Sequence, residues 1–508
     1  MLTAAAIAAA VAALTPLAYL VVRAFGGGTE RVWQVLWQQR TLDLALRSIS
    51  LALAVAAACV VLGVAAAWLV VRSDLPGRRA AAVLLVLPLA VPSYVAAFTW
   101  IAQWPGLSGF WGAFGVLTLV SFPYVLLPVA AALRTADPAL EEVARTLGRS
   151  APRTFALVTL RQVRPAATAG GLLVALYVLS DFGAVSLLRY DAFTTGIFTS
   201  YQATFDRTPA AILGCVLVAL ALVLTVGERR ARGVAAVRGA RGAARQAAVV
   251  PLGRVRVPAA LGVLALLTAS LGVPVYSLLR WLLAGRSAGA DLGDLASAAW
   301  GTVTVSGLGA LLTVALAIPV GVLAARHQGR LARGVELASF AGHALPGITV
   351  GLALVFFGIR VAPQLYQRTP MLAFAYAVLF LPLAVGAVRT AVAAAPPVLE
   401  DVSRSLGKGR AATRLLVTMP LAAPGVLAGA ALVFLTCAKE LPATLLLRPT
   451  GTDTLATELW SNTEIGAFAA AAPYAAVLLV VAAVPALALD QFLRTGSART
   501  RRGEEASR

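Results

Sequence analysis

Long apolar runs recur along the whole chain, separated by shorter polar or glycine-rich stretches. A helix of about 20 mostly apolar residues crosses about 30 Å of hydrocarbon, and these runs have that length. They predict an all-α integral membrane protein with about twelve transmembrane helices. The predicted spans are residues 3–22, 46–71, 80–103, 111–133, 166–188, 209–227, 258–280, 299–325, 335–359, 371–394, 422–446 and 466–489.

Composition supports this prediction. Only 13% of the residues are charged, 60% are hydrophobic, and the mean hydropathy is +0.85. Soluble proteins carry about 25% charged residues. So few charges could not cover a soluble body of 508 residues, and most of the chain is therefore expected in lipid.

The first apolar run has two interpretations. The small residues 26–28 follow it, as they would at the cleavage site of a signal peptide. The run lacks a basic segment before it, however, and its removal would leave an odd number of spans. We therefore expect a retained transmembrane helix.

Positive charge predicts the orientation. If both termini lie on one side, the loops and tail of that side carry 30 of the 42 Lys and Arg residues, whereas the opposite loops carry 11. By the positive-inside rule, both termini are expected in the cytoplasm. The net charge of +20 could also suggest nucleic-acid binding, but the basic stretch 228–257 lies between two spans. We expect this stretch to lie against anionic membrane lipid, with no nucleic acid as partner.

Cysteine and histidine positions predict no metal or catalytic site. Cys59, Cys215 and Cys437 lie in separate apolar spans, too far apart for a ligand motif. We interpret His327 as a loop residue and His343 as a helix-packing residue. We expect no catalytic residue, resident metal or bound cofactor in this chain.

The chain contains an internal repeat. Residues 140–148 (LEEVARTLG) match residues 399–407 (LEDVSRSLG) at an offset of 259, and the register continues without gaps for about 50 residues. Upstream the offset is 254 to 255, because a short insertion lies around residues 396–397. The matched positions include Asp181 with Glu440, Tyr201 with Trp460, Pro92 with Pro346 and Arg134 with Arg389.

The repeat predicts the domain organisation. Two six-helix units are expected, and their even number of spans gives them the same orientation around an axis along the membrane normal. A central pathway would lie between them. The expected parts are the first unit at 1–227, a basic cytoplasmic linker at 228–257, the second unit at 258–490 and a cytoplasmic tail at 491–508.

Each unit has a loop of about 30 residues between its fourth and fifth spans. In the first copy, Asp137 and Pro138 predict the start of a short amphipathic helix over 137–147, and Gly148 predicts its end. The second copy repeats this pattern, with Pro397 at its start and Gly407 at its end. Such a helix could dock a two-fold symmetric partner or lie on the membrane surface, and the pattern alone leaves both open.

These residues resemble a known motif. EEVARTLG, followed by Leu160 and Pro165, and EDVSRSLG, followed by Met419 and Pro420, resemble the EAA loop of bacterial ATP-binding cassette (ABC) importer permeases. The first copy departs from the pattern by having Arg161 where the second has Pro420.

The resemblance covers about residues 45–490 and implies a type I, MetI-like permease fold. The loops, at about 137–165 and 396–424, would form coupling helices that sit in clefts of a homodimeric nucleotide-binding subunit. The implied ATPase-coupling residues are Glu141, Glu142, Ala144, Gly148, Glu400, Asp401, Ser403 and Gly407.

The phosphate-binding motif Gly-x-x-x-x-Gly-Lys-Ser/Thr is absent from these 508 residues. We therefore expect ATP to be hydrolysed by a separate subunit. Two other classes of protein are alternatives to the importer permease. A secondary transporter need not carry a docking helix in each half, and a membrane-embedded enzyme would need a clustered set of reactive groups, which the sequence does not indicate.

Ionisable residues inside the predicted spans are candidate pathway residues, because each costs at least about 2.5 to 3.5 kcal/mol near a helix centre. They are Asp181, Lys439 and Glu440, and we expect the two acids to face each other across the pseudo-axis. A Lys439 to Asp181 ion pair and a role in substrate passage remain equal alternatives. Arg189 and Arg448, at the outer ends, could anchor the helices or dock an acidic patch of a substrate-delivery protein.

The segments around these residues narrow the resemblance. Residues 180–190 (SDFGAVSLLRY) and 439–449 (KELPATLLLRP) resemble the fused permeases of ferric-iron importers of the bacterial inner membrane. The resemblance implies delivery of Fe3+ by an extracytoplasmic solute-binding protein, and hard oxygen ligands such as Asp181 and Glu440 would suit that ion. Fused permeases for thiamine share the same two-copy plan and remain the alternative.

Overall fold

The computed structural model describes residues 2–203, 207–239, 249–284, 291–327, 329–340, 342 and 345–481. Within these ranges the regular structure is helical, apart from one isolated β-bridge between Ser73 and Val250. The all-α prediction is confirmed. His343, linker residues 240–248 and the predicted tail 491–508 lie outside the described residues.

Nine helical segments of the described chain are long and apolar enough to cross a membrane, and a tenth candidate is bent. Two shorter apolar helices, 347–360 and 468–481, coincide with parts of the remaining predicted spans, the second of which continues beyond the described residues. The nine segments are Leu2–Phe25, Gln39–Arg72, Gly109–Thr135, Phe155–Ser180, Thr208–Ala231, Gly253–Ala284, Leu292–Arg326, Thr369–Ala394 and Ala411–Ala438.

The structure corrects the third predicted span of each unit, which is not one straight helix. In the first unit, α4 (Arg78–Leu84) and a short 3-10 turn lead to α5 (Ser93–Ile101) with a bend of 94°. In the second unit, α17 (Arg330–Ser339) is separated from α18 (Gly347–Arg360). α5 and α18 each begin directly after a proline, Pro92 or Pro346, because proline lacks an N–H and keeps the preceding residue out of the helical conformation.

The fifth predicted span of each unit is also interrupted. α10 (Leu160–Ser180) ends before Asp181, and the short α11 (Gly183–Leu187) follows. Likewise α22 (Met419–Ala438) is followed by α23 (Pro442–Leu447). The predicted limits 166–188 and 422–446 therefore run past the helix ends, and the ionisable residues lie at the breaks rather than inside continuous helices.

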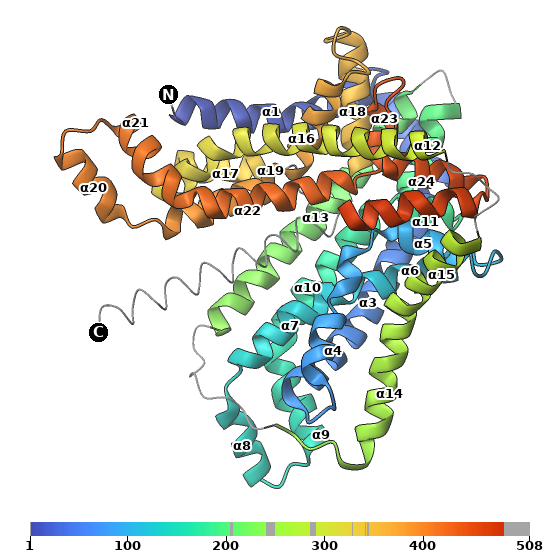
Figure 1. The fold of residues 1–508 in the computed structure, drawn as a ribbon, viewed down its shortest axis with the longest axis vertical. Coiled ribbons are helices and arrows are strands. Elements are labelled where there is room, and N and C mark those ends of the chain that lie inside the picture. The colour runs from blue at the N-terminus through green and yellow to red at the C-terminus, as the bar shows by residue number, and fades with distance from the viewer. Residues whose placement is uncertain are drawn as a thin grey trace.

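The helices form two arms that meet at one end and diverge toward the other (Figure 1). One arm has its tip at α8 (Pro138–Thr146) and α9 (Ala151–Thr154), and the other at α20 (Pro397–Ser405) and α21 (Arg410–Thr413). The first arm also contains α3 (Gln39–Arg72), α6 (Gly109–Ser121), α7 (Pro123–Thr135), α13 (Thr208–Gly239) and, at the meeting end, α12 (Phe193–Ala203). The second contains α16 (Leu292–Arg326), α19 (Thr369–Ala394) and, at the meeting end, α24 (Leu455–Glu464).

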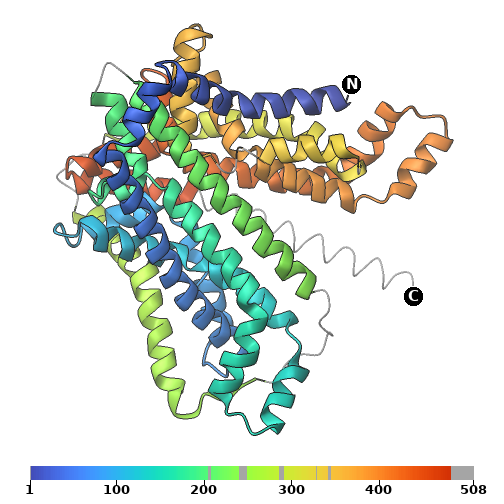
Figure 2. The same cartoon turned by 180° about the vertical axis from the view of Figure 1, so that it is seen from behind.

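The first helix of each half packs on the opposite arm. α1 (Leu2–Phe25) lies along the second arm against α16, α17 and α18, as the view from behind also shows (Figure 2). α14 (Arg256–Leu267) and α15 (Val273–Ala284) lie beside the first arm, where α15 packs on α5. α2 (Thr29–Leu36) connects α1 to α3. This reciprocal exchange ties the two halves together and preserves their pseudo-two-fold relation.

Small residues allow close helix packing within the first arm. Gly63 of α3 and Gly170 of α10 both lie against Val125 of α7, where an added Cβ would come within 2.8 Å of its atoms. Such approaches are typical of membrane helices, which associate by close van der Waals contact rather than by excluding water. A rigid bundle therefore supports the loop at the tip of this arm.

Candidate functional site

The predicted amphipathic helices are present at the tips of both arms. In α8, the Asp137 side chain accepts a hydrogen bond from the Ala139 N–H at 2.9 Å, as an N-cap should. Gly148 follows the helix with φ +77°, and Gly407 follows α20 with φ +80°. This left-handed conformation strongly favours glycine, which explains why both copies end on it.

Each tip helix exposes an apolar stripe. Leu140, Val143 and Leu147 of the first copy are all exposed, although leucine and valine at helical spacing usually cover a core. The second copy exposes its equivalents, which are Leu399, Val402 and Leu406. An apolar stripe that is exposed in the described structure, present once at each arm tip on a charged helix, fits a surface for a two-fold symmetric partner.

The inner acid of each tip helix is held by its own arm. Arg72, the last residue of α3, forms an ion pair with Glu141, which also accepts a hydrogen bond from the Thr159 hydroxyl at 2.8 Å. Arg326 at the end of α16 pairs with Glu400 at 2.6 Å. Glu400 in turn accepts a hydrogen bond from Thr418 at 2.9 Å.

We call each of these three-residue links a strut, because it connects the tip helix to the second span and to the start of the fifth. Sequence reasoning did not single out the arginine or threonine members. Both threonines lie in π-helical turns, Phe155–Thr159 and Arg414–Thr418, which occur at the same repeat position. The two copies therefore leave the loop in the same way, despite Arg161 in one and Pro420 in the other.

The outer acid of each tip helix is exposed. Glu142 is exposed, and its repeat partner Asp401 is exposed and pairs with Arg404 on the same helix. Of the other predicted coupling residues, Ala144 is half-buried and Ser403 is buried, with its hydroxyl 3.1 Å from that of Thr413.

Asp181 and Glu440 each hold the helix break of their own half. Asp181 accepts hydrogen bonds from the N–H groups of Ala184 and Val185 at 3.0 and 3.3 Å, and its other carboxylate oxygen accepts one from Ser93, the first residue of α5. Both acids are buried. Each carboxylate therefore satisfies the N-terminal amides of a short helix beside the third-span break.

Glu440 repeats this arrangement in the second half. It accepts hydrogen bonds from the N–H groups of Ala443 and Thr444, each at 3.0 Å. Its carboxylate lies against Gly347, the first residue of α18, where an added Cβ would be 2.4 Å from the Glu440 Oε1. Gly347 thus stands where the first half has Ser93, and the third-span break again packs on the fifth-span break.

Lys439 links the two halves instead of pairing with Asp181. Its ammonium donates a hydrogen bond to the Ala90 carbonyl at 2.8 Å, and the Tyr94 hydroxyl donates one to the Lys439 carbonyl at 3.3 Å. The described residues contain no ion pair between Lys439 and Asp181. We call this reciprocal pair of hydrogen bonds the apex clasp.

Aromatic side chains pack beside the apex clasp. Phe182 lies 5.0 Å from Phe198 and 6.1 Å from Trp460, measured between ring centroids. Phe182 and Trp460 are buried, and they come from opposite halves. The meeting end of the arms is therefore filled by side chains from both repeats.

The outer arginines differ from each other. Arg448 is half-buried and forms an ion pair with Asp453, whereas Arg189 is exposed and has a left-handed backbone with φ +53°. No group of three or more His, Cys, Asp or Glu side chains gathers in the described residues in a way that could hold a metal ion.

Comparison with known proteins places this architecture in a family. The family model for the binding-protein-dependent transport system inner membrane component matches the chain twice, at residues 59–229 and 317–495. The Fe(3+)-transport system permease protein FbpB 2 of Haemophilus influenzae is 36% identical over 481 residues, which cover 94% of this chain and 95% of that protein.

Shorter relatives match only part of the chain. The sulfate transport system permease protein CysT of Escherichia coli is 28% identical over 42% of this chain and 83% of its own length. The molybdate/tungstate transport system permease protein WtpB of Thermococcus kodakarensis is 24% identical over 40% of this chain and 85% of its own length. With two family matches in one polypeptide, the chain belongs to the binding-protein-dependent transport system inner membrane components, as a fused two-repeat ABC permease.

Proposed function

We propose that a separate pair of ATPase subunits binds α8 and α20 and drives the conformational change of this permease. The duplicated tip helix carries this proposal, because each copy combines an exposed apolar stripe with an acid fixed to its own arm. A loose loop could bind a partner without transmitting its motion. A helix tied by an ion pair to the second span and by a hydroxyl to the fifth would move its arm as a rigid lever.

The arm tips would lie in the cytoplasm, together with both termini. The excess of Lys and Arg on this side of the spans supports this orientation. The meeting end, with the apex clasp and the buried aromatic residues, would then lie toward the outer face. Closure of the ATPase pair would draw the arm tips together and open the outer end, so that access alternates between the two sides.

We propose ferric iron as the substrate, delivered by an extracytoplasmic solute-binding protein. Support comes from the relative whose name specifies Fe(3+) transport, which aligns with nearly the whole chain, whereas the sulfate and molybdate relatives align with less than half. The exposed Arg189 lies in the connection after α11, on the proposed outer face, and is a candidate contact for an acidic patch on the delivery protein.

Uptake by the complete importer in vesicles tests the substrate. The permease, its ATPase and its binding protein are reconstituted, and uptake of radioactive ferric iron is measured with and without excess sulfate, molybdate or thiamine. We expect ATP-dependent iron uptake that none of these solutes suppresses. Uptake of thiamine or an oxyanion in place of iron would overturn the substrate assignment.

The docking role is tested by charge reversal of the outer acids. Glu142→Lys and Asp401→Lys should weaken ATPase binding and uptake, because they change the exposed face and leave the struts intact. Arg368→Glu, in the exposed connection before α19, is a matched control that changes the charge by the same amount with opposite sign away from the tips. Unchanged ATPase binding in both tip variants would contradict the docking proposal.

A further inference from the structure

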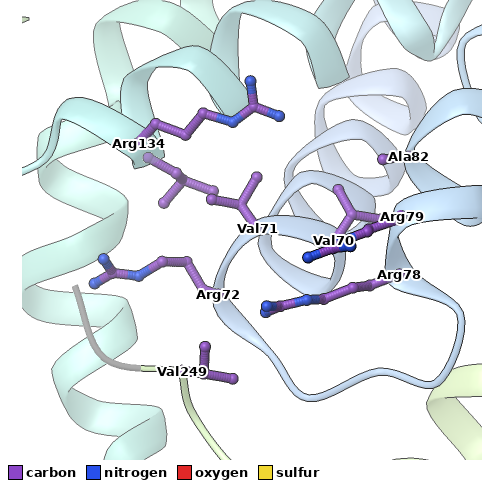
Figure 3. A pocket seen from close by; sticks show the side chains of 9 residues that line it. Val70, Val71, Arg72, Arg78, Arg79, Ala82, Arg134 and Val249 are labelled. Carbon is purple, nitrogen blue, oxygen red and sulfur yellow. The ribbon is translucent and has the colours of Figure 1, made fainter. Parts of the chain in front are cut away.

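A cavity of about 440 Å³ lies at the tip side of the first arm (Figure 3). Four arginines line it: Arg72 from the end of α3, Arg78 and Arg79 from the start of α4, and Arg134 from the end of α7. Figure 3 shows Arg78 and Arg79 extending from one side of the cavity and Arg134 from the other. Val249 of the linker also lines the cavity.

The positive charge of this cavity is mostly uncompensated. Arg72 is paired with Glu141, yet its Nη1 is buried and has no hydrogen-bond partner in the described structure. Arg78 donates to the Ser73 carbonyl at 3.1 Å, and none of the described carboxylates pairs with Arg79 or Arg134. Among the described residues, the cavity therefore presents cationic donors that no carboxylate pairs with, apart from the Arg72–Glu141 pair.

Asp74 is the acid in the loop after α3, and it is not among the ion pairs of the described residues. The Asp74 carboxylate accepts a hydrogen bond from the Leu252 N–H at 2.8 Å. The backbone of the same loop holds the linker, because the Val250 N–H donates to the Arg72 carbonyl at 2.8 Å. Linker residues 240–248 contain no Asp or Glu that could neutralise the cavity.

The second half shows what is missing from the first. At the offset of 254 to 255, Arg326 corresponds to Arg72 and Arg389 to Arg134, and Glu336 corresponds to Ala82. Glu336 forms an ion pair with Arg389. Ala82 lines the cavity and offers only a methyl group. The second half therefore has its own carboxylate at this position, whereas the first half has none.

We propose that this cavity binds a phosphate group, supplied by the headgroup of an anionic lipid in the cytoplasmic leaflet. Guanidinium groups bind phosphate oxygens in pairs of charge-assisted hydrogen bonds, and basic pockets between helices on the cytoplasmic side suit anionic headgroups. Interfacial arginines are common on this side, but a merely positive surface would not leave the buried Arg72 Nη1 without a hydrogen-bond partner in the described structure. The leaflet assignment rests on the proposed orientation.

Lipid retention tests the proposal without the ATPase or any transport assay, so its failure would leave the proposed function untouched. The full-length chain is placed in nanodiscs of phosphatidylcholine with added phosphatidylglycerol, and the phosphatidylglycerol retained per chain is counted by native mass spectrometry. The key variant, Ala82→Glu, gives the first half the carboxylate of the second. Ala80→Glu adds the same charge on the exposed side of α4 and is the matched control.

We expect Ala82→Glu and the double variant Arg79→Ala with Arg134→Ala to bind phosphatidylglycerol about tenfold or more weakly, as the loss of charged hydrogen bonds implies. Ala80→Glu should match the wild type. Glu336→Ala should gain a bound lipid in the second half, and this result stands even if a first-half variant folds poorly.

A second experiment distinguishes the two possible sources of the phosphate. Thermal stability of the chain in phosphatidylcholine alone is measured with rising inorganic phosphate. Inorganic phosphate could stabilise the wild type but not Ala82→Glu while both retain the same amount of lipid. That result would assign free phosphate as the ligand and would still support a phosphate-binding cavity. Equal lipid retention and equal phosphate response in the wild type and Ala82→Glu would overturn the proposal.

Discussion

Removing the inner acid of a tip helix should loosen that helix, and more so in the first half than in the second. The change is Glu141→Gln, which retains the size and an acceptor oxygen but removes the charge that Arg72 requires. Arg72 and Glu141 are 3% and 12% exposed, so water can replace little of the lost interaction. Breaking a buried ion pair by removing one partner costs about 3 to 5 kcal/mol.

The same change in the second half should cost less. Arg326 and Glu400 are 17% and 19% exposed, and Arg326 also donates to the Ala395 carbonyl at 3.0 Å. After Glu400→Gln the guanidinium keeps that acceptor and some access to water. We expect a cost of about 1 to 3 kcal/mol, the range for a charged hydrogen bond.

Hydrogen exchange of the α8 and α20 amides measures these local opening free energies. The control is Asp401→Asn, which removes an exposed pair with Arg404 and should cost under about 1 kcal/mol. A double-mutant cycle with Arg72→Gln should give an interaction energy within about 0.5 to 3 kcal/mol, as contacting residues do. Unchanged α8 exchange in Glu141→Gln, or a zero interaction energy, would refute the strut.

Three further predictions concern the turns, the caps and the apex. Gly148→Val and Gly407→Val should retain ATP hydrolysis but lose uptake in vesicles, because a valine backbone at a φ near +80° is strained by about 1 to 3 kcal/mol. In the control Gly409→Val, where φ is not positive, ATP hydrolysis should still drive uptake. Asp181→Ala should lower the free energy of unfolding by about 1 to 3 kcal/mol in thermal unfolding, because it leaves the buried N–H groups of Ala184 and Val185 without an acceptor. An unchanged melting temperature would contradict a stabilising role for these hydrogen bonds. Lys439→Met should widen spin-label distances between α5 and α24 more than Tyr94→Phe, whose hydrogen bond is the longer, and equal distances in all three proteins would contradict the apex clasp.

The repeat and the tip helices could be predicted from the sequence because their signals are local. Asp137, Pro138 and Gly148 mark the ends of α8 by their own backbone preferences. The broken spans could not be predicted in the same way, because hydropathy reports burial in lipid and not the direction of the helix. Pro92 and Pro346 fit a kinked span as well as a break. The carboxylates of Asp181 and Glu440, which contact the residues after these prolines, come from distant parts of the chain.

The struts and the apex clasp depend on contacts between residues far apart in the chain. Arg72 and Glu141 are 69 positions apart, and only their preservation as Arg326 and Glu400 in the second copy could have suggested the pair. Lys439 is different, because its partner is the Ala90 carbonyl. A backbone acceptor is present at every residue, so no side-chain pattern could have predicted this contact.

The claim that separate ATPase subunits move the two arms is tested most directly by reconstitution. The purified chain is placed in vesicles with ferric-iron-loaded binding protein, and iron accumulation against its gradient is measured with and without the ATPase and ATP. We predict accumulation only when ATPase and ATP are both present. Accumulation by the chain without the ATPase would contradict the account.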